Sequence, residues 1–372
     1  MSTSQPPFRA DHVGSLLRPP ALKELRQKVE AGQASREALR AAEDAAVREA
    51  VALQESVGLQ GITDGEQRRK SWHMDFLLQL GGLSSEGKML PVAFRGPGGE
   101  HRFTRPDLRV SGRITRPAPI FVDAFRFLRS VVSRTPKLTM PSPCMLYTQV
   151  GRANIDRAVY PDLDAWIEDT AAAYRAEIAD LHAAGLRYLQ LDDVSLAYLC
   201  DEGMRAEARA RGEDPDEQLR LSVKLIRATL RDKPAGLTVC THLCRGNYRS
   251  SWRAEGGYAR VAETIFTQLP YDGFFLEFDD ARSGDFSPLR HVPRGVRVVL
   301  GLVTTKVGTL EKKDDLRRRL DEAAKHIPLD QLCVSPQCGF SSTIEGNNVA
   351  VDDQRRKLAL CVELAQEVWG GL

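Results

Sequence analysis

Short apolar runs recur along the chain, and each is followed by small or polar residues and then by a longer segment with helical periodicity. The runs are apolar at nearly every position, which is typical of parallel strands buried on both faces. The predicted strands are 9–15, 58–66, 137–140, 187–192, 236–242, 273–277, 296–300 and 331–334. The predicted helices are 19–29, 35–57, 121–132, 162–185, 214–231, 257–269, 310–326 and 352–369.

Strands that alternate with helices in this way predict the α/β class and, because eight strands are counted, a (β/α)₈ TIM barrel. We expect residues 1–372 to form a single TIM-barrel catalytic domain. The alternation stops near 85–119, where Gly96-Pro97-Gly98-Gly99 lies between short apolar pieces. This stretch predicts an inserted β-hairpin or loop excursion.

Polar residues cluster at the predicted carboxyl ends of the strands. In barrels of parallel strands, this end of the sheet carries the active site. The sequence therefore predicts an active site built from Ser15, Glu66, Pro143, Asp192, His242, Glu277, Thr304 and Cys338.

The strand at 236–242 is a candidate source of metal ligands. Side chains alternate across a strand, so His242 and Cys244 share a face and could converge on one cation. Glu277 and Cys338 follow two other predicted strands and are candidates to complete the site. His, Cys and carboxylate ligands form a set suited to Zn²⁺. Taken on their own, a His and a Cys at a strand end, such as His242 and Cys244, are more often a hydrogen-bonded histidine and an inert buried thiol than metal ligands.

Composition excludes some classes of function. Lys plus Arg number 52 and Asp plus Glu number 50, so net charge gives no reason to expect nucleic acid or an anionic membrane as partner. The seven cysteines are an odd number, and no apolar leader is seen, which favours a reducing, cytoplasmic location. No run approaches the roughly 20 apolar residues of a membrane span. Cys240 and Cys333 lie inside predicted strands and are interpreted as core thiols; an oligomer is left open.

Several motifs together resemble the cobalamin-independent methionine synthase family, in a short form that contains only the catalytic barrel. They are 12–16 (HVGSL), 64–66 (DGE), 189–193 (LQLDD), 335–339 (SPQCG) and the metal motifs. The resemblance implies that Zn²⁺ is held by His242, Cys244, Glu277 and Cys338. It also implies a thiol substrate bound to zinc as thiolate and a methyl transfer to it, as from methyltetrahydrofolate to homocysteine. Displacement of Glu277 from the metal would open the position that the thiol enters.

The resemblance also implies which residues hold the acceptor. Glu66 and Asp192 match positions that bind the amino group of homocysteine, and a carboxylate pair suits a buried ammonium. Val13 and Ser15 match the segment that binds the substrate carboxylate, and His12 precedes it. From the residues alone, Glu66 can instead balance a basic turn, Asp192 can order a loop and His12 can cap a strand. The expected catalytic residues are Glu66, Asp192 and Glu277, and the expected substrate-binding residues are His12, Val13, Ser15, Glu66 and Asp192.

Two departures from the family pattern leave the methyl donor open. Gln149 stands near the position of a Trp that stacks on the pterin, and Gly301–Lys306 occupies the place of the proposed acid–base His. The general acid or base is therefore unassigned near Val303. Methyltetrahydrofolate, methylcobalamin and simpler methyl donors all remain candidates.

Other functions compatible with the sequence make different demands on the site. Another alkyl transfer to a zinc-bound thiolate, such as epoxyalkane to coenzyme M, needs cations for a sulfonate, and Arg68, Arg245 and Arg249 are candidates. Glu66 and Asp192 would repel that anion. From another class, a noncatalytic zinc- or thiol-binding barrel and a zinc-free, decarboxylase-like barrel remain alternatives.

Overall fold

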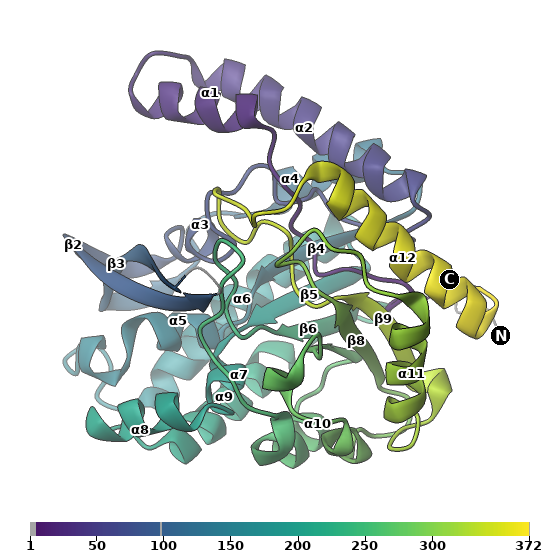
Figure 1. Ribbon diagram of the computed structural model, residues 1–372. Coiled ribbons are helices and arrows are strands. Elements are labelled where there is room, and N and C mark those ends of the chain that lie inside the picture. The colour runs from purple at the N-terminus through teal and green to yellow at the C-terminus, as the bar shows by residue number, and fades with distance from the viewer. Residues whose placement is uncertain (1–4, 97–98, 372) are drawn as a thin grey trace.

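A computed structural model describes residues 5–96 and 99–371 of the protein (Figure 1). Its centre is a curled, seven-stranded sheet in the order β1-β4-β5-β6-β7-β8-β9, in which all neighbours are parallel. The strands are β1 (Gly61–Ile62), β4 (Thr135–Pro141), β5 (Tyr188–Asp193), β6 (Thr238–Leu243), β7 (Gly273–Glu277), β8 (Arg297–Val303) and β9 (Leu332–Pro336). Helices surround the sheet, and the predicted α/β barrel is confirmed.

The segment 9–15, predicted as the first strand, is not a regular strand. It makes one parallel bridge, between Ala10 and Val334 of β9. On its other side, the Thr63 hydroxyl donates a 2.6 Å hydrogen bond to the carbonyl of Gly14. Gly14 has φ +132°, outside the β region, so a regular ladder cannot continue through it. The segment nevertheless fills the gap between β9 and β1, where the eighth strand of the barrel was expected.

The eight predicted helices are present with small shifts at their ends. They are α1 (Pro20–Glu30), α2 (Arg36–Ser56), α4 (Val122–Val131), α6 (Leu163–Ala183), α9 (Pro215–Leu230), α10 (Ala262–Gln268), α11 (Lys313–Ala323) and α12 (Val351–Trp369). Asp162 is the predicted N-cap of α6, and its carboxylate accepts hydrogen bonds from the amides of Asp164 and Ala165.

Short helices that the sequence analysis did not predict lie in the connections between strands. They are α3 (Met74–Leu77), α5 (Cys144–Val150), α7 (Ser195–Tyr198), α8 (Glu202–Ala210), and the 3₁₀ turns 152–154, 281–283, 287–291 and 329–331. Several of these are too short to show a helical period, so they escape detection by hydrophobic pattern. A further 3₁₀ turn, 258–260, forms the start of the predicted helix 257–269.

The predicted insertion is an antiparallel hairpin of β2 (Gly81–Gly96) and β3 (Gly99–Thr115), visible beside the barrel in Figure 1. Of the expected turn, Pro97 and Gly98 lie outside the described residues. Arg95 in β2 and Trp252 exchange backbone hydrogen bonds of 2.6 and 2.8 Å. Because Trp252 belongs to the loop that follows β6, these bonds hold the hairpin against the barrel end where β6 terminates.

The barrel interior contains a buried ion pair. The Lys137 ammonium lies 2.9 Å from a carboxylate oxygen of Asp11, and both side chains are fully buried. The hydroxyl of Tyr188 donates a 2.7 Å hydrogen bond to the second Asp11 oxygen. Cys240 and Cys333 pack into the apolar cluster beside this pair, as predicted for core thiols. A satisfied pair of this kind fixes the position of 9–15, since loss of one partner would leave a buried charge.

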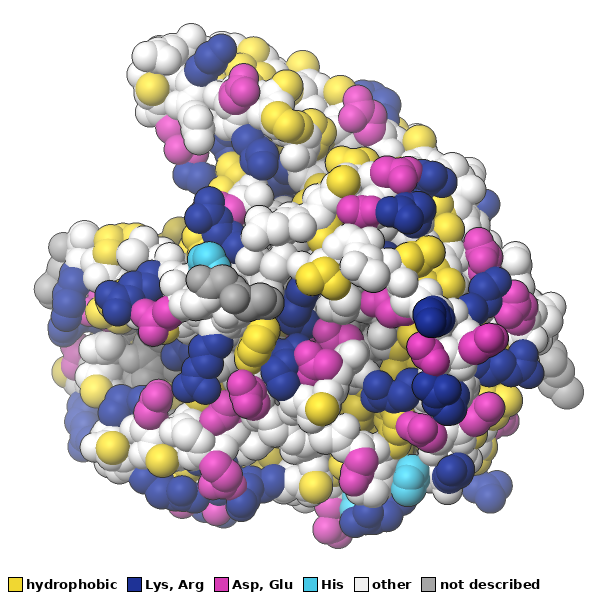
Figure 2. All heavy atoms as spheres, viewed as in Figure 1, with side chains coloured by type: hydrophobic (Ala, Val, Ile, Leu, Met, Phe, Trp, Pro, Cys, Tyr) yellow, Lys and Arg dark blue, Asp and Glu magenta, His cyan; other side chains and the backbone are white. Residues whose placement is uncertain are grey.

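The outer surface carries charges of both signs. In the face shown in Figure 2, acidic and basic side chains are intermixed, and no large region has a single sign. Across the described ranges, no helix combines the length and the apolar character needed to cross a membrane.

Candidate active site

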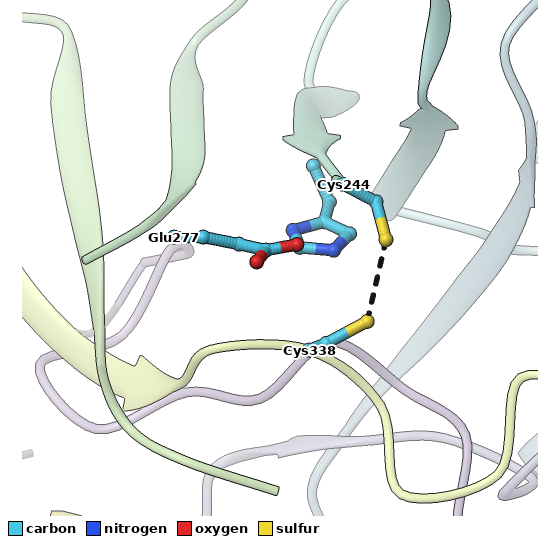
Figure 3. Close-up of side chains that lie close together, drawn as sticks. Cys244, Glu277 and Cys338 are labelled. Atoms are coloured by element: carbon cyan, nitrogen blue, oxygen red, sulfur yellow. Dashed lines mark hydrogen bonds between the residues drawn. The ribbon is translucent and has the colours of Figure 1, made fainter. Parts of the chain in front are cut away.

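The ends of three strands, β6, β7 and β9, bring the four predicted metal ligands together. His242 lies in β6 and Cys244 just beyond it, Glu277 ends β7, and Cys338 follows β9. One ligand atom from each lies within 4.8 Å of the others, and all four residues are buried. Figure 3 shows the side chains of Cys244, Glu277 and Cys338 directed toward a common point. Parallel pairing explains the convergence, because strands in register end at the same edge of the sheet.

The geometry and chemistry of this cluster fit a tetrahedral Zn²⁺ ion. The sulfur atoms of Cys244 and Cys338 are 3.5 Å apart. That is far longer than the roughly 2.05 Å of a disulfide bond. It is close to the separation of about 3.8 Å expected for two thiolates each about 2.3 Å from one tetrahedral zinc. Neither ring nitrogen of His242 has a hydrogen-bond partner among the described residues, so a nitrogen lone pair is available.

The titratable side chains of this cluster shift one another's pKa values. A hydrogen bond from Cys244 and the proximity of His242 hold the pKa of Cys338 well below its ordinary value. Burial raises the pKa of Glu277, although the positive charge of Lys306 opposes that effect. Burial lowers the pKa of His242, but the negative charges of Cys338, Asp192 and Glu277 outweigh it and raise the pKa overall. A divalent cation at this point would stabilise the anionic ligands together.

A second layer of residues fixes the cluster. The backbone amide of Arg245 donates a 2.8 Å hydrogen bond to Glu277 Oε1. The Arg245 guanidinium is buried and donates to the hydroxyl of Tyr258 at 2.8 Å. Lys306 pairs with Asp279 at 2.8 Å. Such contacts orient metal ligands and limit their movement.

A chamber opens beside the cluster, with a volume of about 80 Å³. Of the residues expected to bind acceptor or metal, those that line it are Val13, Ser15, Glu66, Asp192, His242, Cys244 and Cys338. Glu277 belongs to the ligand cluster but does not line the chamber. His12 also does not line it; its Nε2 lies 3.1 Å from the carbonyl oxygen of Gly61. Burial, followed by the charge of Lys137, lowers the pKa of His12 to about 4.

Glu66 combines a strained backbone with an unsatisfied carboxylate. Its φ is +57°, a left-handed conformation that is uncommon outside glycine and is often found at functional sites. One carboxylate oxygen accepts a 2.8 Å hydrogen bond from Thr139 and lies 3.4 Å from the Arg69 guanidinium. The other, Oε2, is buried without a hydrogen-bond partner within the described part of the chain. A buried acceptor of this kind is suited to a donor supplied by a ligand.

Asp192 provides the second carboxylate of the chamber. Its Oδ1 accepts a 2.7 Å hydrogen bond from Gln190. Burial raises the pKa of Asp192 to about 7; His242 opposes this rise and the negative charge of Glu66 adds to it. Two carboxylates in one buried chamber repel each other, and a bound cation such as an ammonium would remove that cost.

The segment 13–15 meets the loop after β9 very closely. A Cβ at Gly339 would lie 2.0 Å from the hydroxyl oxygen of Ser15, so any other residue there would displace that hydroxyl. The amide of Ser341 donates a 3.3 Å hydrogen bond to the same hydroxyl. The carbonyl of Val13 already accepts a 2.7 Å hydrogen bond from Gln190. The wall of the chamber is therefore assembled by close backbone approach.

Arg68, Arg245 and Arg249, the candidates for binding a sulfonate, all lie outside the lining of the chamber. Arg68 pairs with Asp44 and lies 3.5 Å from Glu43. Arg245 is buried beside the candidate ligand Glu277, and the guanidinium of Arg249 lies 5.9 Å from the ring centre of Tyr248.

Sequence reasoning missed the part of the chamber that the insertion supplies. These residues are Val92, Phe94, Phe103 and Arg105 from the hairpin, together with Tyr198, Tyr248 and Arg253 from barrel loops. The ring of Tyr248 lies 5.4 Å from that of Phe94 and 5.5 Å from that of Phe103. No local pattern marks these contacts, because they depend on how the hairpin docks.

Comparisons with known proteins agree on one family. The family model of the cobalamin-independent synthase catalytic domain matches residues 8–367. The uncharacterized protein YxjH of Bacillus subtilis is 43% identical over 365 residues, covering 98% of this chain and 95% of YxjH. A solved structure of a proposed vitamin-B12-independent methionine synthase from Listeria monocytogenes matches with a TM-score of 0.79 and 34% identity, covering 98% of each chain. A 5-methyltetrahydropteroyltriglutamate–homocysteine methyltransferase of a Synechococcus species is 24% identical over 340 residues, which are 91% of this chain and 41% of that protein.

Proposed function

Because the chain belongs to the cobalamin-independent synthase catalytic-domain family, we propose that it is a zinc-dependent methyltransferase that methylates the thiol of homocysteine or a similar acceptor. The observation that carries this proposal is the convergence of four buried side chains that could bind one metal ion, beside a chamber with two buried carboxylates. We further propose that residues 1–372 act as one catalytic domain.

The residues that would hold the metal are His242, Cys244, Glu277 and Cys338. When bound, Zn²⁺ would lower the pKa of a coordinated substrate thiol, so that its sulfur is nucleophilic near neutral pH. Glu277 has an additional partner in the amide of Arg245 at 2.8 Å. That amide would hold the carboxylate in place whether or not it binds the metal.

The chamber would orient an amino-acid acceptor by its charged groups. Glu66 Oε2 has no partner in the described ranges, and Asp192 lies in the same chamber, so both are placed to accept hydrogen bonds from an ammonium. The hydroxyl of Ser15, which lines the chamber, would donate a hydrogen bond to the acceptor carboxylate. The aromatic rings of Phe94 and Phe103 would exclude water from the sulfur.

Metal content and product formation test the proposal together. Purified wild-type protein should contain about one Zn²⁺ per chain and form methionine from homocysteine and a methyl donor, detected by mass spectrometry. The donors to compare are methyltetrahydrofolate, methylcobalamin and simple methyl compounds. Cys338→Ser should lose both zinc and product.

Cys200→Ser is the matched control for the Cys338 substitution. The Cys200 sulfur donates to the carbonyl of Leu196 at 3.6 Å, a contact that a serine hydroxyl can preserve, and it is not part of the metal cluster. This variant should retain zinc and activity. Full zinc occupancy in Cys338→Ser, or a wild-type protein that methylates homocysteine with none of the donors, would contradict the proposed function.

A further inference from the structure

A second, larger cavity adjoins the chamber. Its volume is about 600 Å³, within the range of small-molecule binding sites. The two cavities share Val92, Arg105, Gln149, Tyr198 and Arg253, which therefore form the junction between them. A ligand in this second cavity, called the outer cavity below, would enter the chamber that holds Cys244 and Cys338 if it extended past these side chains.

Two guanidinium groups face this junction without a carboxylate partner. Arg105 donates a 3.1 Å hydrogen bond to the carbonyl of Pro106, and the Arg253 guanidinium lies 5.1 Å from the ring centre of Tyr198. Over residues 5–96 and 99–371, neither forms an ion pair. Burial, and then the like charge of Arg253, lowers the pKa of Arg105. Two partly buried cations side by side repel each other unless an anion lies between them.

The lining of the outer cavity contains further arginine side chains. Arg205 also lines it, and its side chain is only 1% exposed. One Arg205 nitrogen pairs with Asp216 at 2.7 Å, but Nε and Nη1 are buried with no partner in the part of the chain that is described. Arg211 lines the cavity too, but it pairs at 3.1 Å with Glu213, the one acidic residue among the described lining residues, so within the lining the uncompensated charge comes from Arg105, Arg205 and Arg253. Buried donors left free in a positively charged cavity are suited to an oxyanion.

The hairpin and one barrel loop position the two junction arginines. Arg105 lies in β3, and the pairing of Arg95 with Trp252 places the hairpin next to Arg253. Gly246 permits this approach: it has φ +85°, and a Cβ there would lie 3.0 Å from the Cβ of Arg253. The charge pair is thus built by docking of the insertion; it borders the same chamber as Glu66 and Asp192 but comes from different parts of the chain.

We propose that the outer cavity binds the methyl donor through an oxyanion of that donor, a carboxylate, phosphate or sulfonate, held by Arg105 and Arg253 at the junction and by Arg205 in the rest of the cavity lining. The assignment to the donor rests on the proposed methyltransferase function. It places the donor on the side of the junction away from the carboxylates and directs its reactive end into the chamber.

Calorimetric titration of the zinc-loaded protein with sodium sulfate, inorganic phosphate and glutarate, in a cationic buffer, tests the site. Wild type should bind at least one of these probes, more weakly as chloride is added. Arg105→Gln and Arg253→Gln should each bind it about 10-fold or more weakly, as expected for loss of a charge-assisted contact. Arg105→Lys should recover part of the affinity. Arg102→Gln is the control, since Arg102 is in the same strand but exposed and paired with Glu100.

Three outcomes would overturn the inference: no probe binding by wild type, wild-type affinity in both glutamine variants, or displacement of the probe by homocysteine. The last result would assign the arginines to the acceptor. Anion binding is read without turnover, so a failure of methyl transfer leaves this titration interpretable. Conversely, the anion site can fail while the proposed function stands. In that case no probe binds, but zinc content and homocysteine binding persist in wild type and in Arg105→Gln.

Discussion

Replacement of Glu66 by Gln tests the proposed acceptor site with a change of a few atoms. The substitution keeps the size of the side chain and removes its negative charge. Oε1 can still accept the hydrogen bond from Thr139, whereas Oε2, which has no partner among the described residues, is replaced by an NH₂ donor. That donor would face the ammonium of a bound amino acid and repel it.

The expected effect on binding is large and the effect on folding is small. A hydrogen bond to a charged partner contributes about 1.5–3 kcal/mol, which corresponds to about a 10- to 100-fold increase in the Kd for homocysteine. Burial raises the pKa of Glu66, so the carboxylate is costly to bury, and a neutral amide relieves that cost. Arg69, 3.4 Å away, loses a partner but keeps a 2.6 Å hydrogen bond to the carbonyl of Thr139. The melting temperature should therefore change little.

Calorimetric titration of the zinc-loaded variants with homocysteine measures the effect. A thiol acid without the amino group, such as 4-mercaptobutyrate, separates the ammonium contact from the thiol contact. Glu66→Gln should bind this compound as wild type does and should lose affinity for homocysteine alone. Glu363→Gln, a change on the exposed side of α12, is the control. The reasoning is refuted if Glu66→Gln binds homocysteine within twofold of wild type.

Three further predictions concern stability. Gly339→Ala should destabilise the fold by about 1–3 kcal/mol in urea unfolding and weaken homocysteine binding, because the new Cβ would lie 2.0 Å from the Ser15 hydroxyl. Lys137→Met should cost about 3–5 kcal/mol by the same measurement, since it leaves the Asp11 carboxylate buried and unpaired; Lys137→Met with Asp11→Asn should recover part of that loss. Burial, and then Arg105, lowers the pKa of His73 to about 3, so the unfolded chain binds the extra proton below pH 6.5. Wild type should therefore lose stability relative to His73→Gln by about 1.4 kcal/mol for each pH unit from 6.5 toward 3, and equal slopes in urea unfolding would contradict this.

Strand-end chemistry could be predicted from the sequence because it depends on short-range rules. Alternation along 236–242 places His242 and Cys244 on one face, and parallel strands of similar length end together. Once the sheet closes into a barrel, Glu277 and Cys338 therefore lie close to His242 and Cys244. The hairpin was also predictable, since its turn residues and its loss of helical period are local signals.

Other features could not be predicted because they arise only when distant segments meet. The left-handed backbone of Glu66 gives no sign in its neighbours, and glutamate is not a residue that favours this conformation. The sequence of 9–15 is typical of a strand, yet the segment makes only one β-bridge among the described residues, to Val334, because the conformation of Gly14 interrupts the ladder. Arg105 and Arg253 are ordinary charged residues in the sequence, and only the docked hairpin brings them to one junction.

In the proposed reaction, the acceptor would be bound by residues at strand ends, and the methyl donor by residues of an insertion and a loop. The residues proposed to bind the metal and the carboxylates that would bind the acceptor come from strand ends, whose spacing the barrel fixes. The junction arginines come from an insertion and a loop, whose sequence can change without moving the strands. Substitution of Arg105 by Gln should therefore alter which donor is used while zinc content and homocysteine affinity stay constant. Substitutions at Glu66 or Asp192 should alter acceptor affinity and leave anion binding at Arg105 unchanged.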